Sequence, residues 1–565
     1  MLRNFFGLLG LTLVLAALIV FIPSFLNEAA EKEQVAVDLV TDIDAMQEQE
    51  STLNTCSGTT SSNQECQGKP IEDNQLGAES EQTCKYIQSF MKISEDIKVD
   101  EDCHIGVGYT QNLDWNIEAS QFFEIYDGAE FMEDLEAKEH DKIDTHKKFI
   151  ETFLYFFQDG ISAERVTANP QVIKDIMKWL VEKNITHTTE VGGHAPKFAD
   201  RIEEEGCKVF FLREDLSRPV NTTCSEDEDP KHFEGNQEQD TDDHICILYH
   251  SGEKHFGYES PRANRFYFIY DPKGSKFEKV EKYHELIDNM EDGERPERHM
   301  FAGYQYLEGS PKEKTRARFE TMERKWAEMK EQDPQHTIHA ELAHFNLDHT
   351  LHFVMKHLFK FTDSLGLNEH EMYSLLNQYI FYYNRDHPDE DQIPEYEAHN
   401  SRLTPNNSLH LINDLITKYL LTDDKNIISR IQYHTLGHMV TCYDPEKWES
   451  GEDSLFRSGY TSADYCNIPT KEVEPNICKS HSFKKLDLQG LPEGMKLIDR
   501  EYTFSKAHLQ EGVETQDLIQ YIKIEGSPFI CGIISTPTCK DPSKLSGLGD
   551  NISSTGFTYQ SRKFI

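Results

Sequence analysis

The residues whose types and spacing most directly suggest chemistry are the two glycines and the aspartate in Gly547-Leu548-Gly549-Asp550. Paired glycines let the backbone turn tightly and present consecutive amides at the start of a helix, here predicted over 549–557. Such amides form an anion hole suited to a phosphoryl group in transit. Asp550 is placed to accept a proton from a substrate hydroxyl. Taken alone, the pattern also fits a plain turn before a helix. The Gly-Lys-Ser/Thr of a P-loop kinase is absent, which disfavours that class.

The segments before this turn alternate between strand-like and helix-like patterns. Strands are predicted at 104–108, 207–212, 244–250, 265–271, 337–345 and 529–535. Helices are predicted at 310–332, 368–384 and 407–421. This alternation predicts an α/β domain with a central, mostly parallel sheet. Ligands of such sheets bind beyond the carboxyl ends of the strands.

Composition narrows the classes of partner. The chain has 57 lysines and arginines against 100 aspartates and glutamates, a formal net charge of −43. A field of that sign repels phosphate backbones, so no nucleic acid is expected as a ligand. At 37% apolar residues the chain is too polar for a multi-pass membrane protein, yet it can still build a large core.

The N-terminus predicts entry into the secretory pathway. Arg3 is followed by an apolar run from Phe5 to Leu26, so residues 1–26 form either a signal peptide or a signal anchor, and both alternatives stay open. We expect the protein in the endoplasmic reticulum lumen, anchored or soluble, or secreted. Membrane contact would come only through this segment if it is uncleaved. Residues 27–98 are expected to be an acidic, polar, disordered spacer before a domain at 99–565.

Cysteines and glycosylation sequons agree with that compartment. Twelve cysteines suit an oxidising lumen. The candidate pairs nearest in sequence are Cys56 with Cys66 and Cys466 with Cys478. The sequons stand at Asn184, Asn221, Asn406 and Asn551. We expect Asn551 to stay unglycosylated, because it adjoins Asp550 at a folded helix entry.

Several segments, in order, resemble one family. The Gly547–Asp550 turn resembles the C-terminal signature of the ADP-dependent glucokinase family, which has the ribokinase-like fold. Four further segments resemble motifs of this family. Ser260–Phe266 resembles its Asn-Arg-Phe strand, His339–Ala343 its His-x-Glu motif, Ser364–Glu371 its Asn-x-x-Glu motif, and Arg430–Leu436 its Arg-Ile-x-x-His-Thr-Leu segment. The resemblance covers roughly 102–560 and fits the eukaryotic, secretory-pathway type. It implies a three-layer ribokinase-like sandwich and a smaller discontinuous lid drawn from parts of about 112–300.

The resemblance also implies a magnesium site. Magnesium prefers hard oxygen ligands and keeps several waters, so few carboxylates suffice. Glu341 and Glu371 occupy the family's metal-associated positions, and Asp550 is the third carboxylate expected near the ion. Asn368 would help to orient metal-bound water.

The nucleotide would lie beside this metal. The planar guanidinium of Arg265 can donate paired hydrogen bonds to phosphate oxygens. Adenine would lie between the His434 segment and the loop before Asp550. Gly547, Leu548 and Gly549 would then contact the phosphates.

The first part of the expected sugar site follows strand 104–108. Asn112 and Asp114 are similar to family residues that contact sugar hydroxyls. Thr110 stands where the family usually has the first asparagine, which is a departure from its pattern.

The second part comes from later segments. Glu164 resembles the glutamate that contacts glucose; a carboxylate there would repel fructose 6-phosphate, so it favours glucose. Gly192 and Gly193 fit the family's sugar-side glycines, as Gly303 fits a strand-end glycine. His194 replaces the usual Asn or Gln and could still bond a hydroxyl.

Together these features imply an enzyme that moves the β-phosphoryl group of ADP to the 6-hydroxyl of glucose, giving glucose 6-phosphate and AMP. Asp550 would be the general base and Mg²⁺ would assist in-line transfer. A monomer that binds only small molecules is expected. Two alternatives stay open: a ribokinase-like sugar kinase that uses ATP or another hexose, and a catalytically weak luminal protein that binds nucleotide or sugar.

Overall fold

The computed structural model describes residues 73–563, except for 213–242, 271–276, 469–480, 501–507 and some shorter stretches between them. The N-terminal apolar segment, the Cys56–Cys66 pairing and the Asn221 sequon therefore lie outside the described residues. Within the described part, no helix is both long and apolar enough to cross a bilayer.

A ten-stranded sheet forms the centre, in the order β16-β17-β18-β14-β13-β12-β11-β10-β1-β5. Its strands are β1 (His104–Gly108), β5 (Lys208–Phe211), β10 (Arg298–Phe301), β11 (Thr337–Glu341), β12 (Ser364–Asn368), β13 (Arg430–His434), β14 (His438–Tyr443), β16 (Met495–Ile498), β17 (Ile519–Ile524) and β18 (Ile530–Ser535). The run from β5 to β13 is parallel, and the strands from β14 to β16 are added antiparallel. Strands buried on both faces explain the apolar runs in the sequence.

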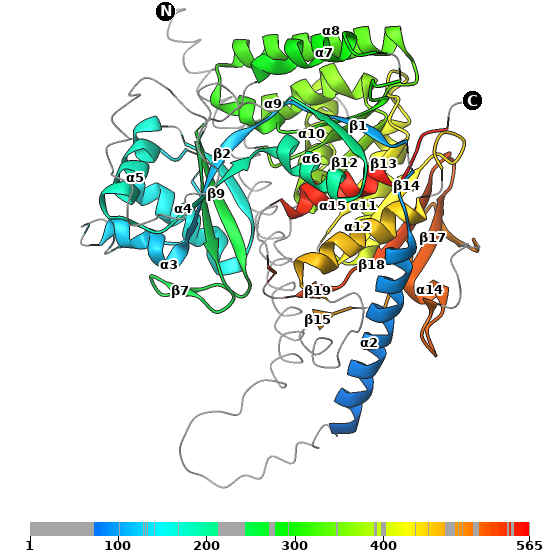
Figure 1. Ribbon diagram of the computed structural model, residues 1–565, viewed down its shortest axis with the longest axis horizontal. Helices are drawn as coiled ribbons and strands as arrows, with labels where there is room; N and C mark the ends of the chain where they lie inside the picture. Colours follow the sequence, from blue (N-terminus) through cyan, green and yellow to red (C-terminus); the bar gives the residue numbers. More distant parts are fainter. Residues whose placement is uncertain are drawn as a thin grey trace, which may run out of the picture. The chain divides into compact units, whose positions relative to one another are not determined.

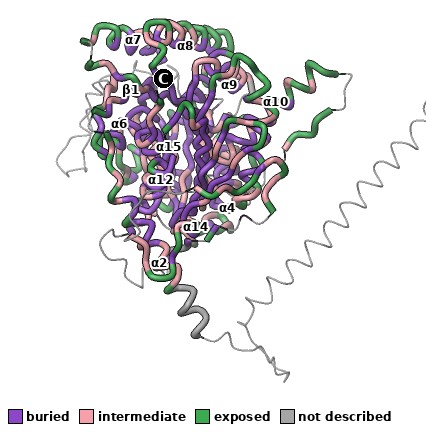
Figure 2. The backbone as a smooth tube through the Cα atoms, turned by 90° about the vertical axis from the view of Figure 1, so that its right-hand side faces the viewer, coloured by how far each residue is buried: buried purple, intermediate pink, exposed green. Residues whose placement is uncertain are grey.

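Helices cover both faces of this sheet, which makes three layers (Figure 1). One layer contains α2 (Asp73–Asp96), α6 (His194–Glu204), α12 (Glu452–Tyr465) and α15 (Leu548–Thr558). The other contains α7 (Val280–Asp288), α8 (Lys312–Gln332), α9 (Asp348–Phe353), α10 (Glu369–Asp386) and α11 (Pro405–Asp414). Strand β10 shows the division, because Phe301 packs with the second layer and Met300 with the first. α15 runs through buried interior, whereas α7 and α8 show exposed outer faces (Figure 2).

A second, smaller sheet has the order β3-β9-β6-β2-β4. Its strands are β2 (Asn112–Glu118), β3 (Ala163–Val166), β4 (Thr188–Gly192), β6 (Asp243–Tyr249) and β9 (Asn264–Tyr270). The helices α4 (His146–Asp159) and α5 (Pro170–Glu182) pack on it around phenylalanines such as Phe149 and Phe266. The chain passes from β1 of the large sheet to β2, β3 and β4 of the small sheet and returns to the large sheet for β5. It then goes back to the small sheet for β6 and β9 before it continues with β10 of the large sheet. The predicted fold class, an α/β sandwich with a smaller discontinuous domain, is confirmed.

Two predictions about the chain's organisation were wrong. The spacer expected over 27–98 does not extend to its predicted end, because α2 packs Ile87, Phe90 and Met91 into the core beside α12. A run of polar residues had hidden this apolar face, whose members recur at helical spacing.

The second error concerns a disulfide. Cys466 pairs with Cys539 at the end of the sheet, not with Cys478. The other disulfides between described residues are Cys103–Cys207 and Cys442–Cys531. All three join segments 73 to 104 residues apart, so short sequence spacing was a poor guide to pairing.

Candidate active site

A cavity of about 310 Å³ opens beyond the carboxyl ends of β11, β12 and β13 and is closed on its other side by residues of β3 and β9. The predicted residues that line it are Glu164, His194, Arg265, Glu341, Asn368, Glu371, His434, Leu548, Gly549 and Asp550. A narrow second cavity of about 30 Å³ is lined by Asp114, Gly193 and Gly547, and also by Glu164, His194, Arg265 and Asp550. Asn112 and Gly192 line neither cavity.

The glycine turn lies at the junction of the two cavities. Gly547 has φ 72° and precedes the first residue of α15, so the helix begins at Leu548, one residue earlier than predicted. A Cβ on Gly549 would lie 3.2 Å from His434 Nε2, which shows how closely the β13 end approaches the turn. Asp550 lies in the first turn, with 16% of its side chain exposed. The backbone amides and the carboxylate thus occupy the positions expected of an anion hole with a neighbouring base.

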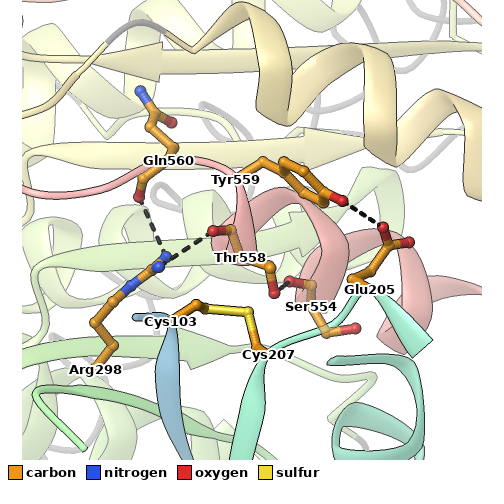
Figure 3. The surroundings of a disulfide bond; sticks show 8 residues. All are labelled: Cys103, Glu205, Cys207, Arg298, Ser554, Thr558, Tyr559 and Gln560. Carbon is orange, nitrogen blue, oxygen red and sulfur yellow. Dashed lines mark hydrogen bonds between the residues drawn. A yellow bond between two sulfur atoms is a disulfide. The ribbon is translucent and has the colours of Figure 1, made fainter. Parts of the chain in front are cut away.

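The far end of α15 is anchored, which fixes the direction in which its first turn points (Figure 3). Arg298 donates from its two terminal nitrogens to the carbonyls of Thr558 (3.1 Å) and Gln560 (3.3 Å). The Tyr559 hydroxyl donates to Glu205 at 2.7 Å. A disulfide joins Cys207, two residues after Glu205, to Cys103, which immediately precedes β1.

Arg265 is a cation that lines both cavities. It follows the first residue of β9, and its Nε is buried without a hydrogen-bond partner among the described residues. Burial opposes its charge, but Tyr267, Cys246, Glu164 and Asp550 together raise the pKa of the guanidinium. A buried, unpaired donor is costly unless a ligand satisfies it, so this guanidinium is suited to an anion.

Glu341 and Glu371 form a buried acidic pair, 3% and 6% exposed. Glu341 ends β11, four residues before the predicted strand end, and accepts a hydrogen bond from the Ser553 hydroxyl of α15. Burial and the neighbouring Glu371 raise the pKa of Glu341, and burial raises the pKa of Glu371 to about 8. Two neighbouring buried carboxylates with raised pKa values fit a divalent ion such as Mg²⁺, which would stabilise their charged forms. Among the described residues no group of three or more His, Cys, Asp or Glu side chains is arranged to hold a metal. Water and phosphate oxygens would therefore complete the coordination.

Asn368 has a structural role that the sequence analysis did not predict. Its Oδ1 accepts hydrogen bonds from the backbone amides of His370 (2.9 Å) and Glu371 (3.1 Å), and its Nδ2 donates to Glu371 Oε1 at 2.8 Å. Glu371 Oε2 in turn accepts from the Asn368 amide at 2.8 Å. This capping box uses the polar atoms of Asn368 to start α10 and to orient Glu371, so Asn368 acts on the site through that carboxylate.

Asn112 and Gly192, the predicted sugar-site residues that line neither cavity, lie against Asp114 and hold it in place. Asn112 Nδ2 donates to Asp114 Oδ1 at 2.5 Å. A Cβ on Gly192 would lie 2.2 Å from the Asp114 carboxyl, so only glycine fits beside it. The Tyr267 hydroxyl donates to Asp114 Oδ2 at 3.2 Å. Burial raises the pKa of Asp114, and the nearby side chains of His244 and Lys197 oppose that shift.

His194 contacts Asp550 directly. Its Nδ1 lies 2.6 Å from Asp550 Oδ1, and its Nε2 lies 2.8 Å from Gln305 Nε2. Gln305 also donates to Glu164 Oε2 at 3.3 Å. Burial opposes charge on the ring, but Asp550, Glu164 and Glu371 raise the pKa of His194. The structure thus joins residues 356 positions apart in sequence.

Sequence reasoning missed two residues here, Gln305 and Lys197. The Lys197 ammonium donates to Glu190 at 2.8 Å, and its side chain lies beside Gly547 in the narrow cavity. Its position three residues after His194, on the same helix face, was a usable signal. No sequence pattern marked Gln305, which lies in the short helical turn Tyr304–Gly309 after β10.

Comparison with known proteins places these residues in context. A family model described as the ADP-specific phosphofructokinase/glucokinase conserved region matches residues 103–559. A probable ADP-dependent glucokinase from Caenorhabditis elegans is 22% identical over 441 residues, which cover 75% of this chain and 79% of that protein. The ADP-dependent glucokinase of Bos taurus is 23% identical over 438 residues, covering 75% and 78%.

Among solved structures, an ADP-dependent kinase in complex with fructose 6-phosphate and ADPβS has a TM-score of 0.49 at 16% identity, and covers 85% of this chain and 98% of its own. An adenosine kinase from Schistosoma mansoni has a TM-score of 0.31 at 9% identity, covering 68% and 94%.

Proposed function

This chain belongs to the ADP-specific phosphofructokinase/glucokinase family, and we propose that it transfers the β-phosphoryl group of ADP to the 6-hydroxyl of glucose. One observation carries the proposal: Asp550 and the amides at the start of α15 face Arg265 and the Glu341–Glu371 pair across a single cavity. That arrangement offers a base, an anion hole, a cation and hard-oxygen ligands around one point, which is what phosphoryl transfer requires.

The residues have distinct tasks in the transfer. Asp550 accepts the proton of the 6-hydroxyl as its oxygen forms a bond to the β-phosphorus, and the bond from that phosphorus to the bridging oxygen breaks to release AMP. The amides of Gly549 and Asp550 and the Arg265 guanidinium stabilise the charge on the transferring group. Mg²⁺, when bound, neutralises phosphate charge, and Glu341 and Glu371 would hold it. Positioning supplies most of the rate, because the protein forms no covalent bond to the phosphoryl group.

Glu164 supports glucose as the acceptor. Its carboxylate lines both cavities and accepts a hydrogen bond from Gln305. A carboxylate can accept from a neutral sugar hydroxyl, whereas it repels the phosphate of fructose 6-phosphate. The related structure bound to fructose 6-phosphate describes that protein; Glu164 favours the neutral hexose in this one.

We also propose that the protein works as a monomer in the secretory pathway, inside the endoplasmic reticulum or after secretion. The apolar N-terminal segment, the sequons and three disulfides between described residues support an oxidising compartment. Asn551 should stay unglycosylated, because its Nδ2 donates to the Tyr465 hydroxyl and is part of the folded site. Peptide mapping of the purified, active protein for glycan at Asn551 tests this statement.

A single assay separates the proposal from its alternatives. The purified protein is given Mg²⁺ with either ADP or ATP, and either glucose or fructose 6-phosphate, and the release of AMP or ADP is followed. ADP-dependent phosphorylation of glucose is expected, and Asp550→Asn should lower its rate by about 10²- to 10⁴-fold. Preference for ATP would overturn the donor, and preference for fructose 6-phosphate would overturn the acceptor. No turnover with any hexose would favour a luminal binding protein.

A further inference from the structure

The ring of His194 is hydrogen-bonded on both sides, and the bonds define which nitrogen carries the proton. The Gln305 amide must point its nitrogen toward Glu164, because the carboxylate can only accept. The same nitrogen lies 2.8 Å from His194 Nε2, so in the neutral ring Nε2 accepts a hydrogen bond and carries no proton. The ring proton is therefore on Nδ1, where it is donated to Asp550 Oδ1 at 2.6 Å.

We propose that His194 is a positioning residue for the base: it holds the Asp550 carboxylate by one oxygen and leaves Oδ2 to face the sugar hydroxyl. This inference rests on the proposed phosphoryl transfer and adds a residue to it. It replaces the expectation that His194 binds a sugar hydroxyl, because neither ring nitrogen is free to do so. Glu164, on the small sheet, is connected to the base through Gln305 and His194.

The surroundings of His194 hold its ring in this orientation. Gly193 has φ 94°, which places His194 as the first residue of α6. The ring packs between Phe198 and Tyr306, with centroid distances of 6.2 and 5.6 Å. A side chain that is buried, packed on two faces and bonded at both nitrogens has little rotational freedom, as a positioning residue requires.

The two helices that carry the pair are also fixed to each other. α6 and α15 pack side by side, and Arg201 Nε of α6 donates to Thr555 Oγ1 of α15 at 3.0 Å. Arg201 is itself paired with Glu205, and the Glu205 carboxylate also pairs with Arg457 of α12. The contact between His194 and Asp550 at the N-terminal ends therefore belongs to a bonded helix–helix interface.

The positioning role and direct sugar binding predict opposite kinetics. Loss of a positioning residue lowers kcat and leaves the KM for glucose nearly unchanged, because the interaction matters mainly as the hydroxyl reacts. Loss of a sugar ligand raises the KM for glucose while kcat is kept.

Two amide substitutions make a matched test. In His194→Asn the amide nitrogen takes roughly the place of Nδ1 and can still donate to Asp550. In His194→Gln the amide lies near the place of Nε2, so it can meet Gln305 but not Asp550. We expect His194→Gln and His194→Ala to lower kcat about 10- to 100-fold, with the KM for glucose within threefold of wild type. His194→Asn should recover at least half of that loss on a logarithmic scale. ADP binding should be unchanged in all three variants, and the melting temperature should fall most in His194→Ala, which leaves a cavity beside Phe198 and Tyr306.

An increased KM with unchanged kcat, or rescue by Gln rather than Asn, would overturn the positioning role. A second measurement does not depend on turnover: the ring ¹⁵N shifts of His194, identified by their loss in His194→Asn, should show a proton on Nδ1 and none on Nε2 at pH 8. The opposite tautomer would refute the inference even if the wild-type protein were inactive. Inactivity of the wild type with the expected tautomer would instead refute the proposed function alone.

Discussion

Gly366 controls the position of the Glu341 carboxylate, and adding one methyl group there should disable the site. Gly366 of β12 is paired in register with Glu341 of the neighbouring strand β11. A Cβ on Gly366 would lie 1.7 Å from Glu341 Oε2 and 2.6 Å from Ser553 Oγ. Ordinary contact requires about 3.4 Å, so the carboxylate in Gly366→Ala must retreat by roughly 1.7 Å. A displacement of about 1 Å in a positioned group can cost about 100-fold in rate.

We therefore expect Gly366→Ala to lower kcat by about 100-fold or more and to raise the Mg²⁺ concentration needed for half-maximal rate. Crowding in a packed strand should also cost about 1–3 kcal/mol of stability. The assay is steady-state phosphorylation of glucose over a range of Mg²⁺ concentrations, with thermal unfolding measured on the same samples. Gly437→Ala is the matched control, because a Cβ there meets no atom within 4 Å.

Glu341→Gln keeps the side-chain volume and removes the charge, so it separates a lost ligand from a lost fold. It should reproduce the weakened response to Mg²⁺ even if Gly366→Ala fails to fold. The reasoning is wrong if folded Gly366→Ala retains kcat within threefold of wild type, or if Glu341→Gln responds to Mg²⁺ as the wild type does.

Three further predictions follow from other contacts. Asp550→Asn should lower kcat by about 10²- to 10⁴-fold with little change in ADP binding, measured by steady-state kinetics and calorimetry. Burial lowers the pKa of His284 to about 3 and holds that of His299 well below its usual range. As the pH falls below about 6.5, the unfolded chain takes up these protons before the folded protein does. The free energy of unfolding, measured with urea, should therefore be highest above that pH and fall toward pH 3 by up to about 1.4 kcal/mol per pH unit for each histidine. Replacing Cys103 and Cys207 with serine should lower the unfolding free energy by about 2–4 kcal/mol, measured by denaturant titration, because their disulfide joins residues 104 apart.

A local pattern predicted the part of the site at the start of α15. The Gly547–Asp550 turn starts a helix as expected, since its glycines and its aspartate act within one turn of α15. Glu341 and Glu371 were predicted from the family resemblance and not from a local pattern; Glu341 ends β11 and Glu371 lies in the first turn of α10, which follows the neighbouring strand β12. Strand β12, which precedes Glu371, was not among the predicted strands, so the alternation of strands and helices did not predict that the two glutamates meet at one edge of the sheet.

Contacts between elements that no rule of topology brings together were beyond prediction. Gln305 reaches Glu164 from a short turn, and Cys466 reaches Cys539 across the end of the sheet. Neither pair has a spacing or a residue type that distinguishes it from many others in the chain. Asn368 shows a related limit, because a residue beside a site can act on it through helix capping rather than by touching the ligand.

The two departures from the family's sugar-side pattern, Thr110 and His194, were the reason to consider a degraded pocket. Thr110 is fully buried, lines neither cavity, and lies where a Cβ on Gly303 would collide with it at 2.5 Å. The Thr110 side chain therefore packs beside Gly303, away from both cavities. His194 forms a hydrogen bond to Asp550, so the histidine that stands in place of Asn or Gln contacts the base directly. With Glu164 and Asp114 still facing the narrow cavity, neither departure supplies a physical reason for lost activity, and the case for a binding protein without catalysis loses its basis in the sequence.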